Sequence, residues 1–142
     1  MLGRTAVVVC AVALVISFWG PLPTPAICSV VPRVCTEFFS STAAFSGVVV
    51  SERDWSSPSE PDSIERTYYK LKVENFYRGP SEEFIEVYTE NDSGRLTLDV
   101  GHEYLLFARA SAGKLQIWCG GNSAELKDAP ERSARLSASW RE

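Results

Sequence analysis

The clearest alternation of apolar and polar residues lies in the middle of the chain. Between Arg66 and Tyr77, Tyr69, Leu71 and Val73 occupy every second position, and the residues between them are charged. A period of two predicts a β-strand with one face buried and the other in solvent. This strand is the best-defined element that the pattern predicts.

Further strands are predicted on both sides of it, separated by turn residues such as Gly, Pro, Asn and Asp. They are expected at residues 43–51, 83–89, 96–100, 102–108 and 115–119. Gly47 lies inside the first of these, where we expect a bend or bulge. Five or six short strands with turns at regular intervals predict an all-β domain, built as a small antiparallel barrel or sandwich.

Three segments do not fit a strand pattern. Residues 36–41 are expected to form one or two helical turns, with Thr36 as the N-cap. Residues 52–65 are rich in Ser, Pro, Asp and Glu and predict a mobile loop, in which Trp55 is either a lid over the core or an exposed contact. Residues 128–142 are polar and predict a frayed tail, or a helix with Leu136 and Trp140 on one face.

The N-terminus has the layout of a secretory signal peptide. Arg4 precedes an uncharged apolar run of about 14 residues, which is shorter than the roughly 20 needed for a membrane span. Cleavage is expected after Ala26, with the cut before or after Ile27 left open. We therefore expect a signal peptide at 1–26, one domain at 27–126 and a polar tail at 127–142. The mature protein is expected to be secreted or periplasmic, with no membrane span.

Net charge limits the class of binding partner, and the cysteine content predicts a disulfide. The chain has 14 basic and 18 acidic residues, and loss of Arg4 with the signal gives 13 − 18 = −5. Nucleic acid is therefore not an expected partner. Loss of Cys10 leaves Cys28, Cys35 and Cys119, and export makes a disulfide the expected state. Cys119 is expected to pair with either Cys28 or Cys35, and these residues alone do not decide which.

No combination of residues predicts catalysis. The chain has one histidine, His102, and nothing that resembles a nucleophile elbow, so an enzyme is not expected. No set of ligands has the spacing of a zinc site, and no cofactor is expected. Gly120 and Gly121 are interpreted as a turn and not as a phosphate-binding loop. Asn91 begins an N-glycosylation pattern in a predicted exposed turn, which matters only in a eukaryotic host.

The order of several short motifs resembles a known family. They are Cys28–Pro32, Ala44–Val49, Val73–Pro80, Val100–Ala108 and Trp118–Gly120. In this order and spacing they resemble the netrin-like module of the tissue inhibitors of metalloproteinases, most closely the single-domain proteins of that type in bacteria. The resemblance covers roughly residues 28–126. It implies a five-stranded OB-fold-like antiparallel barrel with short accessory helices.

The resemblance also implies an inhibitory edge at the mature N-terminus. Cys28 would chelate the catalytic zinc of a metalloprotease through its α-amine and carbonyl, and Ser29 would enter the specificity pocket. Val30, Val31 and Pro32 would form the rest of the edge. The chain itself would hold no metal.

Two cysteine positions of the family are changed in this chain. The second family cysteine is replaced by Val30, and a mid-chain cysteine before a glycine is replaced by Ser93. The expected function is a secreted protein-binding module that inhibits a zinc metalloprotease through this edge. The alternative is a non-inhibitory interaction module of the cell envelope or extracellular space with the same fold. The target protease and the oligomeric state are not predicted.

Overall fold

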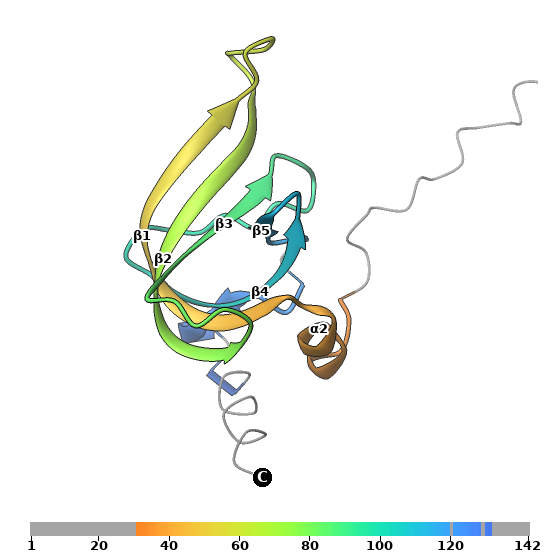
Figure 1. Ribbon diagram of the computed structural model, residues 1–142, viewed down its shortest axis with the longest axis vertical. Helices are drawn as coiled ribbons and strands as arrows, with labels where there is room; N and C mark the ends of the chain where they lie inside the picture. Colours follow the sequence, from red (N-terminus) through yellow and green to blue (C-terminus); the bar gives the residue numbers. More distant parts are fainter. Residues whose placement is uncertain (1–30, 120, 129, 132–142) are drawn as a thin grey trace, which may run out of the picture.

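The computed structural model describes residues 31–119, 121–128 and 130–131 (Figure 1). Within them the chain is mostly β, as the pattern predicted. The elements are α2 (Val34–Ser40), β1 (Ala43–Ser56), β2 (Ile64–Arg78), β3 (Phe84–Glu90), β4 (Glu103–Ser111), β5 (Lys114–Gln116), β6 (Ala124–Glu125) and the 3-10 helix η1 (Leu126–Asp128).

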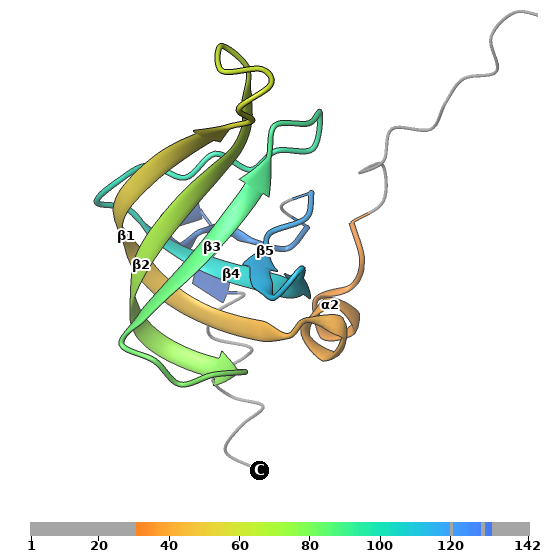
Figure 2. The same ribbon diagram turned by 45° about the horizontal axis from the view of Figure 1, so that its top comes forward.

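The strands form one sheet whose hydrogen-bonded pairings close into a ring. The arrangement of these strands can be followed in Figure 2. The order is β1-β2-β3-β5-β4, and β4 pairs back with β1. Most neighbours are antiparallel, as expected. The exception is the β3–β5 pair, which is parallel with Val87 opposite Leu115. The prediction of an entirely antiparallel arrangement was therefore wrong at this junction.

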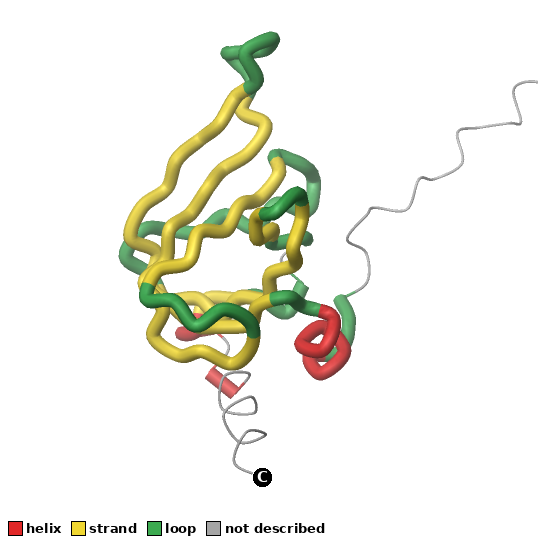
Figure 3. The backbone as a smooth tube through the Cα atoms, viewed as in Figure 1, coloured by secondary structure: helices red, strands yellow, loops and turns green. Residues whose placement is uncertain are grey.

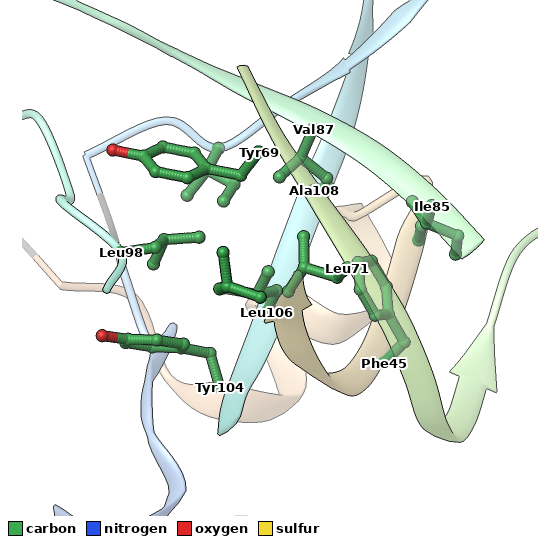
Figure 4. Packing of buried hydrophobic residues seen from close by; sticks show 12 residues of the cluster. Phe45, Tyr69, Leu71, Ile85, Val87, Leu98, Tyr104, Leu106 and Ala108 are labelled. Carbon is green, nitrogen blue, oxygen red and sulfur yellow. The ribbon is translucent and has the colours of Figure 1, made fainter. Parts of the chain in front are cut away.

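The main core lies inside the ring. Tyr69 and Leu71, which the alternation of β2 placed on one face, are fully buried there with Phe45 and Leu106 (Figure 4). Side chains from β1, β2, β3 and β4 converge on the same space. Burial of these apolar side chains is the principal stabilising contribution, since each contributes about 1.5–3 kcal/mol when fully removed from water.

β4 is buried on both of its faces. Leu106 faces the main core, whereas Leu105 and Phe107 belong to a second cluster with Phe38 of α2. Leu126 of η1 packs against this second cluster. Burial on two faces explains why β4 is almost continuously apolar in sequence, where a strand with one solvent face would alternate.

β1 and β2 extend beyond the ring as a two-stranded ribbon (Figures 1 and 3). Residues 52–56, predicted to begin a mobile loop, instead continue β1, and Arg53 pairs with Tyr68 of β2. That prediction was wrong because it took polar composition as evidence against a strand. Polar residues are not expected to be buried, but their backbone can still pair in a ribbon that is exposed to solvent. Trp55 is half-buried on this ribbon, opposite Arg66.

Three predicted boundaries also differ. Residues 96–100 form no strand, although Leu98 is buried in the core. β5 ends at Gln116 and does not reach residue 119. The helix begins at Val34 with Arg33 at the N-cap position, so Thr36 lies inside the helix and is not its cap.

The predicted signal peptide at 1–26, and Leu136 and Trp140 of the predicted tail, lie outside the described residues. Among the residues that the structure describes, no helix has the length and apolar character to cross a membrane.

Gly47 permits the close approach of β1 and β2. The pairing register shifts between Ser46 and Gly47, as the glycine predicted, and a Cβ atom at this position would lie 2.6 Å from the carbonyl oxygen of Lys72. That oxygen belongs to the backbone of the next strand and cannot move aside alone.

We expect Gly47→Ala to lower the free energy of unfolding by about 1–3 kcal/mol, because the added methyl group forces the strands apart. Chemical denaturation measures this change. Ser51→Ala, in an exposed position of the same strand, is the control and should change stability by less than about 0.5 kcal/mol. Equal effects of the two substitutions would contradict the packing argument.

Candidate functional site

The candidate site is the segment that leads into α2. Of the predicted inhibitory edge, Cys28, Ser29 and Val30 lie outside the described residues, whereas Val31 and Pro32 are described. Val31 is 62% exposed. Pro32 is half-buried and lies two residues before the helix.

α2 buries an acidic side chain beside an aromatic one. Phe38 packs into the cluster on the outer face of β4, and its neighbour Glu37 is only 6% exposed. The helix ends immediately afterwards, where Ser41 donates from both its backbone N–H and its hydroxyl to the carbonyl of Glu37. A buried carboxyl group requires hydrogen-bond donors, because its desolvation is otherwise unfavourable.

Asn122 supplies those donors. Its backbone N–H and its side-chain amide donate to Glu37 Oε2 at 2.7 Å and 2.6 Å. The same side-chain amide donates to the carbonyl oxygen of Pro32 at 2.8 Å. Asn122 is itself 5% exposed. We call these three residues, Pro32, Glu37 and Asn122, the N-terminal clamp.

Gly121 makes room for the clamp. Its φ of +53° lies in the left-handed region, which glycine adopts without strain. A side chain here would collide with the carboxyl oxygens of Glu37. The second glycine of the Gly120–Gly121 pair is therefore needed both for its backbone conformation and for the approach of Asn122 to α2.

The clamp fixes the base of the predicted edge to the turn between β5 and β6. Pro32 is 90 residues from Asn122 in sequence, and their hydrogen bond holds the chain where it enters α2. The prediction named Val31 and Pro32 but missed Glu37 and Asn122. Two sequence features could have indicated them. Glu37 is an acid next to Phe38 in a short helix, and Asn122 is a small polar residue directly after two glycines.

Cys35 is an exposed free thiol in α2. The alternative in which Cys35 pairs with Cys119 is therefore not the arrangement in this structure. Cys119 is half-buried and is not a free thiol.

His102 is part of a chain of charged side chains on the surface. Its Nδ1 lies 2.7 Å from Glu125 Oε1, and Lys127 Nζ lies 2.8 Å from Glu125 Oε2. The hydrogen bonds from Lys127 and, to a lesser degree, from His102 hold the pKa of Glu125 below its ordinary value. In the described part of the chain no three His, Cys, Asp or Glu side chains are grouped to bind a metal ion.

The glycosylation pattern at Asn91 lies in a turn, as predicted, and Asn91 is exposed. Its side-chain nitrogen donates to the carbonyl of Ile64 at 2.9 Å, and its side-chain oxygen accepts from Arg95 at 3.1 Å.

Loss of the clamp should be measurable as loss of stability. Glu37→Ala removes the acceptor for two buried donors of Asn122, each worth about 1–3 kcal/mol, so we expect the free energy of unfolding to fall by about 2–4 kcal/mol. Glu37→Gln keeps an oxygen acceptor and should cost less. Chemical denaturation measures both.

Thr36→Ala, exposed on the same helix, is the matched control and should have little effect. If Glu37→Ala were no more destabilising than Thr36→Ala, the clamp would not contribute to the fold.

The ion-pair chain predicts a pH response. Because the folded pKa of Glu125 is lowered, its contribution to stability is present above its unfolded pKa and is lost as pH falls through the folded value. Lys127→Met removes the largest cause, so the pKa of Glu125 should rise toward its ordinary value. An NMR titration of the Glu125 carboxyl carbon measures this. An identical pKa in both proteins would show that Lys127 does not hold the carboxylate in solution.

Comparison with known proteins adds no further constraint: no protein-family model matches the chain, and no curated protein matches it.

Proposed function

We propose that this chain is a secreted protein-binding module with the fold of the tissue inhibitors of metalloproteinases, and that its N-terminal edge binds a zinc metalloprotease. The strand order supports an OB-type barrel, because five strands pair in a ring and β4 returns to β1. α2 and η1, packed on the second cluster, correspond to the accessory helices. The family resemblance gives the position of the edge.

The N-terminal clamp is the observation that carries this proposal. An inhibitor binds tightly when its contact segment is already held in place, since ordering that segment on binding reduces affinity. Asn122 holds the Pro32 carbonyl, and Val31 directly before it is exposed. The clamp thus supplies part of the anchoring that the absent family cysteines, replaced by Val30 and Ser93, do not.

A disulfide between Cys28 and Cys119 is the second anchor in this proposal. Cys35 is free, and this supports Cys28 as the proposed partner among the three mature cysteines. Cys119 lies three residues before Asn122, so both anchors would act on the same stretch of chain. Closing so long a loop is worth about 4–5 kcal/mol in the chain-entropy model.

The chemistry at the edge is direct coordination of the partner's zinc. If the mature chain begins at Cys28, its α-amine, with a pKa near 8, loses a proton and binds the metal together with the Cys28 carbonyl. Ser29 would then enter the specificity pocket. No catalytic step by this chain is involved.

The alternative function is a non-inhibitory interaction module with the same fold. The position of signal cleavage favours it, because Thr24-Pro25-Ala26 fits the preference for small residues before the cut. A mature chain that begins at Ile27 carries its α-amine one residue too far from the Cys28 carbonyl for chelation.

The two functions are distinguished by a matched pair of mature proteins, one beginning at Cys28 and one at Ile27. We expect the Cys28 form to inhibit members of a zinc-protease panel at stoichiometric concentration, and the Ile27 form to be at least about 100-fold weaker because it cannot chelate. N-terminal sequencing of the exported protein shows which form exists. Absence of inhibition by the Cys28 form, or equal inhibition by both, would contradict the chelation mechanism.

A further inference from the structure

The outer face of β1, β2 and β3 carries basic side chains stacked on aromatic rings. Along β2, Arg66, Tyr68 and Lys70 point away from the core, because they alternate with the buried Thr67 and Tyr69. Arg53 lies opposite Tyr68 on β1, and Lys114 of β5 lies over the same ring. We call Arg53, Arg66, Lys70 and Lys114 the cationic face.

Tyr68 lies between two of these cations. The guanidinium of Arg53 is 4.6 Å from the ring centroid and the ammonium of Lys114 is 4.4 Å from it. The two side chains leave Tyr68 only 7% exposed. Cations at these distances are attracted by the face of the ring, which fixes where they stand.

The other two cations are held in the same way. Arg66 lies 5.4 Å from the ring of Trp55 and 5.5 Å from that of Tyr88, and Lys70 lies 4.9 Å from Phe84. Significant contacts of this kind occur about once in 70–80 residues of an ordinary protein. Five on one face of this short chain indicate a preorganised surface.

The cations of this face outnumber the acids that accompany them. Glu86 lies 3.9 Å from both Arg53 and Lys114, and Glu90 lies 3.9 Å from Arg66. Pairs of this length in solvent contribute little. The four cations and these two carboxylates leave an excess of two positive charges, although the whole chain has a net charge of −4.

The cations also remain open to solvent. The side chain of Arg53 is 58% exposed and that of Lys114 is 53% exposed. Beside them, a hollow of about 300 Å³ is lined by Tyr68, Tyr88 and Lys114, and also by the acidic Glu82 and Glu86. This volume is at the lower limit for ligand-binding pockets.

The spacing of the cations and the exposed aromatic rings indicate which class of anionic ligand fits this face. Arg66 and Lys70 are four residues apart on one strand, or about 13 Å. Phe84 is 39% exposed and Trp55 is half-buried, so both offer ring surface to the apolar side of a sugar. We propose that this face binds a carboxylated polysaccharide, with its uronic-acid groups on the cations and its sugar rings against the aromatic side chains.

Binding of the full mature protein to immobilised polygalacturonate tests this proposal, with uncharged dextran as the reference polymer. We expect saturable binding to polygalacturonate alone. Raising salt from about 50 to about 300 mM should weaken it about tenfold, because binding releases counterions from the polymer.

The variant Arg53→Gln with Lys114→Gln should weaken binding about tenfold, since it removes two of the four cations. Lys127→Gln, a change of charge on η1, is the control and should bind like the unmodified protein. Thermal unfolding of each variant establishes that it is folded.

Should the double variant misfold, Lys70→Gln alone replaces it, with a loss of about threefold expected. Unchanged binding by a folded variant, or equal binding of dextran, would overturn the proposal. Tighter binding of polyglutamate or single-stranded DNA than of polygalacturonate would overturn it as well, in favour of a peptide or nucleic-acid partner.

Discussion

The buried hydrogen bonds between Glu37 and Asn122 are the constraint on which the N-terminal part of the structure depends. A carboxyl group at 6% exposure is tolerated only because two N–H donors of Asn122 reach it. These bonds join α2 to the turn between β5 and β6, 85 residues away in sequence. Gly121 has to be glycine for the same reason, because a side chain would displace the acid.

The molecule has two separate surfaces that we propose for binding: the segment before α2 and the outer face of β2. The ring of strands buries one face of each strand in the main core, and β4 uses its second face to seat α2. The edge before α2 therefore stands on a fixed base, with Val31 exposed. The outer face of β2 is a different surface, with basic groups held by Tyr68 and its neighbours. A role at either surface does not require the other.

The sequence pattern predicted those elements in which the alternation of apolar and polar residues follows directly from burial of one face. β2 was found because Tyr69 and Leu71 alternate with charged residues, and burial confirms that alternation. Residues 96–100 show the same period but form no strand, since Leu98 reaches the core from a loop without a paired neighbour. The extension of β1 past residue 51 was missed because a polar ribbon has no apolar period. The clamp was missed because a contact between residues 37 and 122 leaves no local pattern.

The most direct test of the account is hydrogen exchange at the backbone amide of Asn122. If this amide donates to the buried carboxyl of Glu37, its exchange with deuterium should be slow and should approach that of core amides in β2. The amide of the exposed Lys127 provides the reference for fast exchange. Exchange at Asn122 as fast as at Lys127 would show that the clamp is open in solution, and would contradict the view that the N-terminal edge stands on a fixed base.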